Sequence, residues 1–571
     1  MKKCMSMLLM LSMLLTSVAL AQNVSFTAGT YEAVGRGHGG DVAVKVTFTD
    51  HAIESVEITS HNETPSICDL AIERIPQEIV AQQSLAVDTV TGATKSSNAI
   101  LAAVAACVEL AGGDVDALSV KRDATAAVNE EIEADVAVIG AGFAGLTAAV
   151  EAADAGLKVV VIEKLSDVGG SSKMSSGKFP APQSGEHDEG VIYTVEGFVD
   201  AWMTRVDGMA DREMVVMLNE NSEATFNWLA EHGVAFKPAV TSFTGYKLSN
   251  YSTDGETTRG GDVTTPLYEH LLKTDHASVR LDTTANELIA ENGAVVGVKS
   301  MRKDGGELTV KAKAVILATG GYDQNAEMLA EYSPIAAGDA SLSSIGNTGD
   351  GLRMAMAVGA DTVFKNGVIG TAIVGGNKER GASNLMLNLN AERIANESEY
   401  YPDGYLTRKA EGSAYCWDIF DVSGYKDKYE AYIANGDGFV ADTLEELAGM
   451  IGLDVQKMMA SVARYNELCA LGEDQDFGKD PTKMLAIVQA PFYAMRVDNG
   501  SFGSLGGVKI NAKCEVLDKN GQAISGLYAA GEIANGDLNG VKVPWSGAPL
   551  TLAVVLGRQA GVNAVEYISA Q

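Results

Sequence analysis

The stretch Ala134-Asp135-Val136-Ala137-Val138-Ile139-Gly140-Ala141-Gly142-Phe143-Ala144-Gly145 decides the fold of this 571-residue chain. An apolar, β-branched strand runs directly into a glycine pattern, and residues 146 to 155 follow with the alanine-rich composition of a helix. A second strand, 159 to 162, then ends at Glu163. Strand, glycine turn, helix and strand in this order predict a dinucleotide-binding unit.

Each glycine of this stretch has its own physical role. Gly140 allows the tight turn, Gly142 lets a pyrophosphate approach the N-terminus of the helix, and Gly145 lets helix and strand pack closely. Glu163 lies where the ribose hydroxyls of a nucleotide are expected. The alternative is an ordinary strand-turn-helix that binds no nucleotide.

Three glycine-rich segments follow this unit along the chain: Gly169 to Gly177, Ala314 to Gly321 and Gly526 to Glu532. Their order, from about residue 134 to the C-terminus, resembles the flavoproteins of the succinate dehydrogenase and fumarate reductase family. The resemblance implies non-covalent FAD rather than NAD. A helix from about 550 to 567 is expected to direct its positive N-terminal end at the flavin pyrimidine and stabilise the anionic reduced flavin. The residues that the resemblance implies for FAD binding are Gly140, Gly142, Ala144, Gly145, Glu163, Lys164, Gly170, Ser171, Ser172, Ser176, Gly177, Thr319, Gly320, Asp350, Glu532, Ala548 and Leu550.

A second resemblance lies near the N-terminus, in Asp88-Thr89-Val90-Thr91-Gly92-Ala93-Thr94-Lys95-Ser96-Ser97. This segment is similar to the site in FMN-binding domains where FMN is joined to a threonine hydroxyl through a phosphoester. The resemblance implies covalent FMN on Thr94, attached by a flavin transferase, and the small Gly92 and Ala93 allow that enzyme close to the backbone. Alternatively, hydroxyls of residues 94 to 97 cap a helix expected from 98 to 110. Both interpretations hold together, because capping needs only one hydroxyl.

The first residues have the order of a secretory signal peptide. Lys2 and Lys3 precede an apolar run from 5 to 15, and Ala19-Leu20-Ala21 precedes Gln22, where we expect the mature protein to begin. We therefore expect a periplasmic or other extracytoplasmic location. The apolar run is shorter than the ~20 residues of a membrane span, and no later segment has that length, so no stable membrane insertion is expected.

The composition of the chain limits which partners and cofactors are expected. The formal net charge of -32 and the lack of a basic run disfavour nucleic acid. An acidic surface favours solubility, and it can also steer docking to a basic electron-transfer partner. The six cysteines show no short-range pairing and no Cys-x-x-Cys-His, so we predict no disulfide framework, no haem and no metal site.

The predicted fold class is α/β: a Rossmann-like FAD-binding domain with an inserted α+β capping domain, preceded by a small α+β FMN-binding domain. Strands are expected at 41 to 49 and 53 to 59, and short strands and helices between 362 and 500. The predicted division is a signal peptide (1–21), the FMN-binding domain (22–118), a linker (119–133), the first part of the FAD-binding domain (134–361), the capping domain (362–502) and the second part of the FAD-binding domain (503–571).

The candidate proton donor comes from the capping domain. Asn388 to Glu397 resembles the family segment just before its catalytic arginine, and Tyr401 occupies that arginine's position, four residues past Glu397. The family transfers hydride from flavin N5 to one carbon of a C=C bond while a cap residue protonates the other. A phenol with a pKa near 10 keeps a proton for this purpose at neutral pH. Tyr401 is alternatively a packing aromatic, in which case Arg408 is the second candidate donor. Arg380 matches an arginine of the family's proton-delivery path, although Asn377 replaces its acidic neighbour.

The substrate-clamping residues of the family are missing. Members that use dicarboxylates hold them with two histidines and an arginine, but the last histidine of this chain is His276. Phe502 stands where a histidine is expected, and residues 541 to 547 contain no arginine. A substrate pocket of Phe502, Gly503 and Trp545 predicts a larger, apolar or aromatic substrate with at most one carboxylate. Fumarate is disfavoured, because an unpaired carboxylate would cost several kcal/mol.

The leading hypothesis is a respiratory reductase of an activated alkene, an α,β-unsaturated acid of the urocanate or aryl-acrylate type. Signal peptide, FMN domain and FAD domain occur in the same order in urocanate reductases. An external donor, a cytochrome or a membrane quinol dehydrogenase, is expected to reduce FMN, FMN to reduce FAD, and FAD to reduce the substrate. Two alternatives remain: an enzyme like the ketosteroid 1-dehydrogenases, indicated by Tyr528 and the loop 544–547, or an electron-transfer flavoprotein without a small-molecule substrate.

Overall fold

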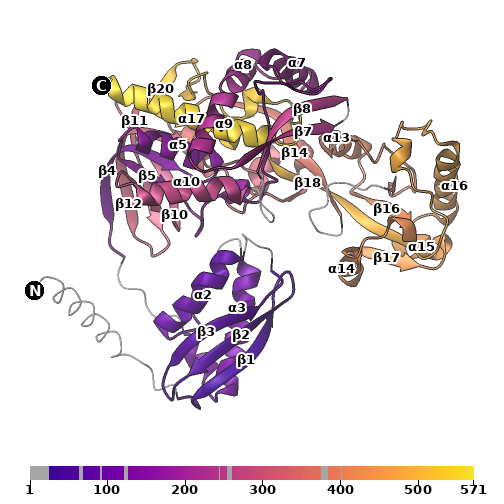
Figure 1. Cartoon of the computed structure of the whole chain (residues 1–571), viewed down its shortest axis with the longest axis horizontal. Coiled ribbons are helices and arrows are strands. Elements are labelled where there is room, and N and C mark those ends of the chain that lie inside the picture. The colour runs from indigo at the N-terminus through magenta and orange to yellow at the C-terminus, as the bar shows by residue number, and fades with distance from the viewer. Residues whose placement is uncertain are drawn as a thin grey trace, which may run out of the picture. The chain divides into compact units, whose positions relative to one another are not determined.

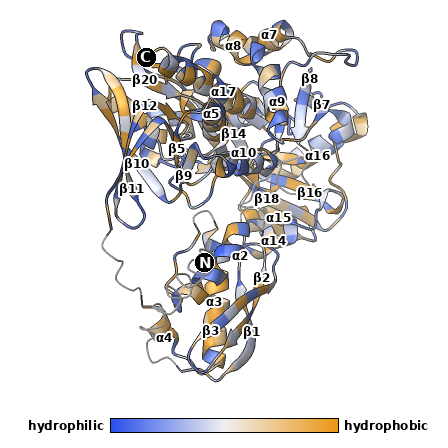
Figure 2. Ribbon diagram, turned by 60° about the vertical axis from the view of Figure 1, so that its left-hand side comes forward, coloured by the Kyte–Doolittle hydropathy of each residue, from blue (hydrophilic) through white to orange (hydrophobic). Residues whose placement is uncertain are grey.

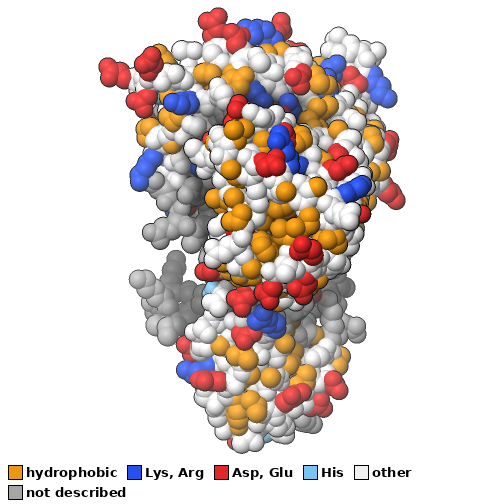
Figure 3. Space-filling model, turned by 90° about the vertical axis from the view of Figure 1, so that its right-hand side faces the viewer, with side chains coloured by type: hydrophobic (Ala, Val, Ile, Leu, Met, Phe, Trp, Pro, Cys, Tyr) orange, Lys and Arg blue, Asp and Glu red, His pale blue; other side chains and the backbone are white. Residues whose placement is uncertain are grey.

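The chain folds as two compact units in a computed structural model (Figure 1), one made mainly of the residues up to Val128 and one made of most of the rest. The residues that the structure describes are 25–63, 68–90, 93–120, 127–243, 245–253, 260–374, 384–399 and 401–571. Within these ranges no helix is both long enough and apolar enough to cross a bilayer. Acidic side chains are spread over the face drawn in Figure 3 and do not gather into a single patch.

The smaller unit is an antiparallel sheet covered by helices. The predicted strands are confirmed as β2 and β3, and β2 turns Val42, Val44 and Val46 into the core. Helix α3, drawn largely in the hydrophobic colour in Figure 2, lies so close to β1 that a Cβ on Gly35 would be 2.0 Å from the carbonyl oxygen of Ala99. In the order β1-β2-β3 the strands are Gly29–Arg36, Asp41–Phe48 and Ile53–Ser60, and the helices are α2 Asp69–Gln82, α3 Thr94–Leu110 and α4 Val115–Leu118.

The larger unit is built on an eight-stranded sheet with the order β10-β11-β20-β12-β4-β5-β9, with β19 paired to β20. Strands β20, β12, β4, β5 and β9 run parallel, so their carboxyl ends meet at one edge, where open α/β sheets bind ligands. The strands are β4 Glu130–Ile139, β5 Val159–Ile162, β9 Ala277–Arg280, β10 Thr283–Glu291, β11 Ala294–Arg302, β12 Glu307–Leu317, β19 Glu515–Leu517 and β20 Ala523–Ala529.

Two apolar helices lie side by side against this sheet, α5 and the C-terminal α17 (Figure 1). Glycines allow the contact, because a Cβ on Gly557 would be 2.4 Å from the carbonyl oxygen of Ala144. A small sheet, β6-β8-β7, completes the unit. Its bounds and those of the helices are β6 Lys178–Pro180, β7 Phe236–Phe243, β8 Tyr246–Thr253, α5 Phe143–Asp154, α6 Gly170–Lys173, α7 Val195–Arg205, α8 Arg212–Glu220, α9 Ser222–Glu231, α10 Gly261–Lys273, α11 Ala326–Tyr332, α12 Asp350–Ala357 and α17 Ala548–Ser569.

The region from 362 to 508 supplies five strands of a six-stranded sheet, built around one long strand, and β13 supplies the sixth. The expectation of short strands is wrong for β14 and β18, which have 13 and 17 residues and pair with each other. The predicted boundary at residue 502 falls inside β18. The elements are β13 Ala340–Ser341, β14 Thr362–Val374, β15 Leu385–Leu387, β16 Tyr415–Asp421, β17 Gly438–Ala441, β18 Phe492–Val508, α13 Tyr401–Glu411, α14 Tyr429–Ala434, α15 Leu444–Ile451 and α16 Val455–Leu471.

Candidate flavin-binding and active site

The glycine turn between β4 and α5 has the predicted division of roles. Gly140 has a φ of +103°, and a Cβ there would be 2.3 Å from the carbonyl oxygen of Ala318. A Cβ on Gly145 would be 1.8 Å from the carbonyl oxygen of Gly140. A Cβ on Gly142, the N-cap of α5, would meet no atom closer than Oγ of Ser172 at 3.3 Å and the carbonyl oxygen of Gly169 at 3.8 Å. Two glycines are therefore required by packing, while the third keeps open the space that a pyrophosphate needs, so the turn fits a dinucleotide.

This difference predicts opposite effects for two alanine substitutions. Gly142→Ala should weaken FAD binding by about 10-fold or more, because its methyl group enters the phosphate position, while the flavin-free protein stays as stable as the parent. Gly145→Ala should instead lower the thermal midpoint of the flavin-free protein, because its methyl group meets backbone. Flavin titration and thermal scans of both variants measure the two effects. Equal loss of stability in the two variants would contradict the assignment of Gly142.

Charged residues expected to bind FAD lie at the same sheet edge. Glu163 is buried and accepts a 2.8 Å hydrogen bond from the backbone N–H of Ala141, which ties it to the glycine turn. Lys164 donates a 2.6 Å bond to Asp350, the first residue of α12. Burial raises the pKa of Asp350, but the hydrogen bond and charge of Lys164 outweigh it, so the pKa lies below its usual value. Asp350 is therefore a carboxylate at neutral pH.

The other predicted FAD residues surround these groups. Ser172 accepts from Phe143 N–H at 3.1 Å, and Ser171 accepts from Ser344 N–H at 2.9 Å. The remaining ones lie at turns and element ends: Gly170 (φ +47°), Gly177 (φ +62°) and Gly320 (φ +72°) in left-handed conformations, Ser176 beside Gly177, Thr319 after β12 and against α12, Ala144 in α5 against the turn at Gly531, and Ala548 and Leu550 in the first turn of α17.

Glu532, which is half-buried, and the buried Asp323 form an acidic pair. Glu532 accepts hydrogen bonds from Ser504 N–H (2.7 Å) and from Nδ2 of Asn347 (3.1 Å), and the same Nδ2 lies 3.2 Å from Asp323. Burial and the neighbouring Asp323 raise the pKa of Glu532 to about 8. Burial also raises the pKa of Asp323. Glu532 therefore keeps its proton at neutral pH in the flavin-free protein and can donate a hydrogen bond.

This raised pKa makes stability depend on pH. The unfolded chain releases the Glu532 proton near pH 4.3, but the folded chain holds it until about pH 8. Stability should therefore fall as the pH rises between these values and stay level above them. In Glu532→Gln this part of the fall should disappear. Thermal midpoints of the flavin-free protein from pH 5 to 9 measure it, with the exposed Glu445→Gln as control. Parallel curves for the parent and Glu532→Gln would show that the carboxyl is not held protonated.

The segment before Tyr401 is fixed by buried ion pairs. Arg393 lies 2.9 Å from Glu397 and 2.8 Å from Asp474, and Lys479 lies 3.2 Å from Glu397. Glu397 also accepts a hydrogen bond from the backbone N–H of Met386 in β15. These contacts hold the decapeptide 388–397 rigidly, four residues before the candidate donor.

The structure brings Tyr401 and Phe502 together. Their ring centroids are 6.0 Å apart and the planes are nearly perpendicular. Both rings are partly exposed and pack on a small apolar cluster of Ile369, Leu505 and Val543. A Cβ on the adjacent Gly503 would be 2.8 Å from Oε1 of Glu532. Cδ1 of Ile369 would lie 3.1 Å from the same Cβ, so the apolar cluster on which Tyr401 and Phe502 pack reaches the residue next to Glu532 of the predicted FAD site.

Two predictions for this region need correction. The side chain of Trp545 has no exposed surface and packs edge-to-face on Trp202 and Phe198, so it belongs to the core and does not line a pocket. Arg408 is buried too: its Nε donates to Asn499 (2.9 Å) and its Nη2 to the carbonyl oxygen of Thr371 (3.0 Å). Burial lowers the pKa of Arg408, and its hydrogen bonds join β14 to β18. Arg380 and Asn377 lie outside the described residues.

Two cations contact the first turn of α13, the helix that begins at Tyr401, and neither was predicted as a site residue from the sequence. Asp403, in the first turn of α13, accepts from Nη2 of Arg205 (2.5 Å) and from Nζ of Lys542 (2.7 Å). Arg205 also donates to the carbonyl oxygen of Pro544 (3.1 Å). Lys542 lies in the loop 541–547, where the family resemblance implies an arginine, so a cation at this place could be expected from the sequence. Arg205 is at the end of α7, almost 200 residues from Tyr401, and only the fold brings it here.

Thr94 is the first residue of α3, and the helix begins there instead of at residue 98. The N-cap is Ala93, which makes no side-chain cap, so Thr94 does not cap the helix. Ser97 holds the preceding loop, accepting from Val90 N–H (3.0 Å) and donating to the carbonyl oxygen of Ala93 (2.9 Å), and Ser96 bonds to Glu63. Thr94 itself is exposed. Thr91 and Gly92 lie outside the described residues.

Comparison with known proteins agrees with this geometry. Residues 135–544 match the FAD binding domain family, and residues 37–109 match the FMN-binding domain family. Urocanate reductase of Eggerthella lenta is 29% identical over 94% of this chain and 92% of its own length. NADH:acrylate oxidoreductase of Vibrio harveyi is 29% identical over 95% of this chain, which spans only 62% of that relative.

Among solved structures, the open conformation of a flavocytochrome c3 fumarate reductase matches with a TM-score of 0.66. The two are 28% identical, and the match covers 76% of this chain and 79% of that one. The chain therefore belongs to the fumarate reductase flavoprotein family of FAD-dependent oxidoreductases, and it has an N-terminal FMN-binding domain.

Proposed function

We propose that this protein is an extracytoplasmic respiratory reductase of the C=C bond of an α,β-unsaturated acid, of the urocanate or aryl-acrylate type rather than fumarate. The pair Tyr401 and Phe502, on the apolar cluster that reaches Gly503 next to Glu532, is the observation that supports it most directly. An external donor, a cytochrome or a membrane quinol dehydrogenase, supplies the electrons through FMN and FAD. The relatives named as acrylate and urocanate reductases support this reaction class.

Bound FAD supplies the hydride for one alkene carbon. The Tyr401 hydroxyl donates the proton to the other carbon, and the contact with Phe502 orients the phenol ring. The aromatic or apolar part of the substrate packs on Phe502 and the cluster of Ile369, Leu505 and Val543. The rigid segment before Tyr401 fixes the position of the donor.

The charges at the start of α13 do not favour a dicarboxylate. Arg205 and Lys542 both pair with Asp403. Lys542 also lies 3.9 Å from Asp207, and Glu399 interacts electrostatically with both cations. Acidic side chains therefore already balance the two cations, and no surplus positive charge is left for a second carboxylate. The second carboxylate of fumarate would meet the Phe502 ring without a cation, at a cost of several kcal/mol.

FMN belongs on Thr94 in this proposal. The hydroxyl is exposed for a flavin transferase and lies at the N-terminus of a 17-residue helix, where the helix dipole favours a phosphate group. The extracytoplasmic location rests on residues 1–21, which lie outside the described residues. Export is checked by N-terminal sequencing of the mature protein, which should begin at Gln22.

Oxidation of reduced viologen by the flavin-loaded protein tests the reaction. Urocanate and aryl-acrylates should be reduced faster than acrylate, and fumarate slowest. Fumarate as the best substrate would contradict the monocarboxylate site. Steroid dehydrogenation in place of alkene reduction would support the ketosteroid dehydrogenase alternative. Failure of every alkene with both flavins bound would favour an electron-transfer flavoprotein.

A further inference from the structure

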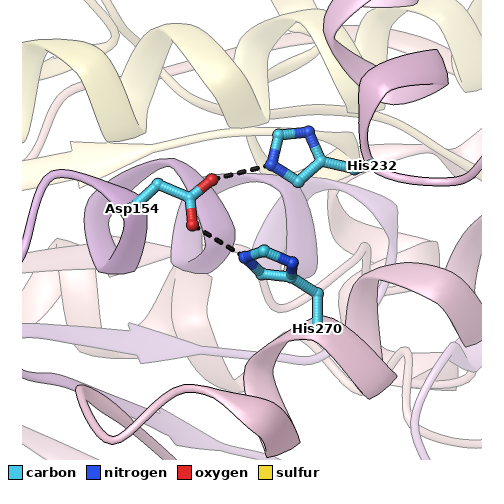
Figure 4. Close-up of side chains that lie close together, drawn as sticks. All are labelled: Asp154, His232 and His270. Carbon is cyan, nitrogen blue, oxygen red and sulfur yellow. Dashed lines mark hydrogen bonds and ion pairs between the residues drawn. The ribbon is translucent and has the colours of Figure 1, made fainter.

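Side chains from three helices meet at one carboxylate in the larger unit (Figure 4). Nε2 of His232 lies 2.7 Å from Oδ2 of Asp154, and Nε2 of His270 lies 2.7 Å from Oδ1 of the same residue. The three candidate ligand atoms lie within 4.8 Å of one another. We call these residues the His-Asp-His cluster. None of them belongs to the predicted FAD site or to the cap.

The contacts of His232 fix which nitrogen faces Asp154. Nδ1 lies 2.8 Å from the carbonyl oxygen of Trp228, which can only accept, so Nδ1 carries a hydrogen. In the neutral ring, Nε2 then turns a lone pair toward the Asp154 carboxylate at 2.7 Å, which is repulsive. The contact therefore requires either a proton shared between the two atoms or a metal ion between them. One ring nitrogen on a backbone carbonyl and the other on a metal is the common arrangement of metal-binding histidines.

The surrounding helices make this place negative. Asp154 is the last residue of α5, His232 is the C-cap of α9, and His270 is in the last turn of α10. The C-terminal end of a helix has a partial charge of about -0.5. Three such ends and one carboxylate favour a cation of more than one charge.

We propose that Asp154, His232 and His270 bind one divalent transition-metal ion of the Zn²⁺ type. Two imidazole nitrogens and one carboxylate oxygen suit Zn²⁺, Co²⁺ or Ni²⁺, whereas Mg²⁺ and Ca²⁺ prefer oxygen alone. Tetrahedral bonds of about 2.0 Å place ligand atoms about 3.3 Å apart, so the contact to the binding oxygen must widen by roughly 0.6 Å. The other ligand atoms, which lie within 4.8 Å of one another, must adjust to the same spacing. The side chains of His270 and Asp154 are 37% and 38% exposed, which leaves room for this movement and for a water as fourth ligand.

This site revises the prediction of no metal. That prediction rested on the spacing of the cysteines, whereas this site uses two histidines that are 78 and 116 residues from Asp154. The ion would join the C-terminal ends of α5, α9 and α10. Because α5 begins at the glycine turn, the ion should stabilise the helix on which FAD binding depends.

Metal binding is tested on the mature, tag-free protein with both flavins bound, after treatment with a chelator. Calorimetric titration with ZnCl₂ and metal analysis should show one Zn²⁺ more in the parent than in His270→Ala or Asp154→Asn, with affinity at least about 10-fold weaker in the variants. Zn²⁺ should also raise the thermal midpoint of the parent but not of the variants. His276→Ala removes an exposed histidine of the same unit and should bind Zn²⁺ like the parent. Millimolar Mg²⁺ should not compete.

Two results would overturn the proposal. Equal Zn²⁺ content in the parent and in both variants would place any bound ion elsewhere, including on the flavin phosphates. No Zn²⁺ binding by the parent would overturn it as well, and a lower midpoint of Asp154→Asn in the presence of chelator would then show that the His-Asp-His cluster serves the stability of the fold alone.

Discussion

Tyr401→Phe should lower kcat for alkene reduction by about 10²- to 10⁴-fold while both flavins stay bound. The substitution removes only the hydroxyl, so the edge-to-face contact with Phe502 and the packing on Val543 remain. KM should change little, because the lost interaction acts on the proton in the transition state. Steady-state kinetics with reduced viologen and the best substrate of the alkene series measure both constants.

A matched variant distinguishes the effect of losing the Tyr401 hydroxyl from the effect of losing any tyrosine hydroxyl in the cap. Tyr425→Phe removes the hydroxyl of another cap tyrosine, which packs on Tyr429 and Tyr493 away from the apolar cluster, and it should leave kcat unchanged. A solvent isotope effect on kcat in the parent that is lost in Tyr401→Phe would support proton donation by the phenol. Near-normal turnover of Tyr401→Phe would exclude Tyr401 as the donor.

Thr94→Val should abolish covalent FMN and leave FAD content unchanged. Valine matches the shape of threonine but has no hydroxyl to form the phosphoester. Turnover with a physiological donor should then fall to background, because the entry point for electrons is missing. Flavin fluorescence of the denatured protein on a gel, and the intact mass, report the covalent flavin.

The Thr94→Val experiment needs a control for protein stability and for the choice of residue. Thr94 does not cap α3, since the N-cap is Ala93, so Thr94→Val should keep the thermal midpoint of the smaller unit. Thr89→Val changes a threonine of the same segment and should retain covalent FMN, and Thr94→Ser should retain it in part. Full covalent FMN in Thr94→Val would place the attachment at another residue.

The sequence predicts best where local rules agree. The strand at 159 to 162 is found with those bounds, because four β-branched residues lie between a helix and a carboxylate. Helix starts are less accurate: α5 begins at Phe143 and α3 at Thr94, since glycine or alanine at the N-cap gives no hydroxyl or carboxylate signal. Strand β18 was missed, because its glycines conceal the alternation of a strand.

The site is less predictable than the fold, for a different reason. Tyr401, Phe502 and Gly503 were predicted because each occupies a position of a family motif, and the structure brings the rings of Tyr401 and Phe502 together. Arg205 reaches Asp403 only through the packing of α7 against the loop at 544, and no local pattern records that contact. Trp545 was misplaced because its type suggests an aromatic pocket, whereas the fold buries it between Trp202 and Phe198.

The pairing of β14 with β18 has a mechanical consequence. The two strands remain paired from Thr362 with Val508 to Val374 with Val497, so the capping region is joined to the FAD-binding region by a ribbon and not by loose linkers. Any rotation of the cap must bend or twist this ribbon. We expect bending at its register shifts near Gly367 and Gly370 and at the glycines at positions 500, 503, 506 and 507. Ile369, Phe502 and Gly503 lie on the ribbon itself. A cap rotation that opened the site would therefore also change the orientation of these three residues, which form part of the proposed substrate surface.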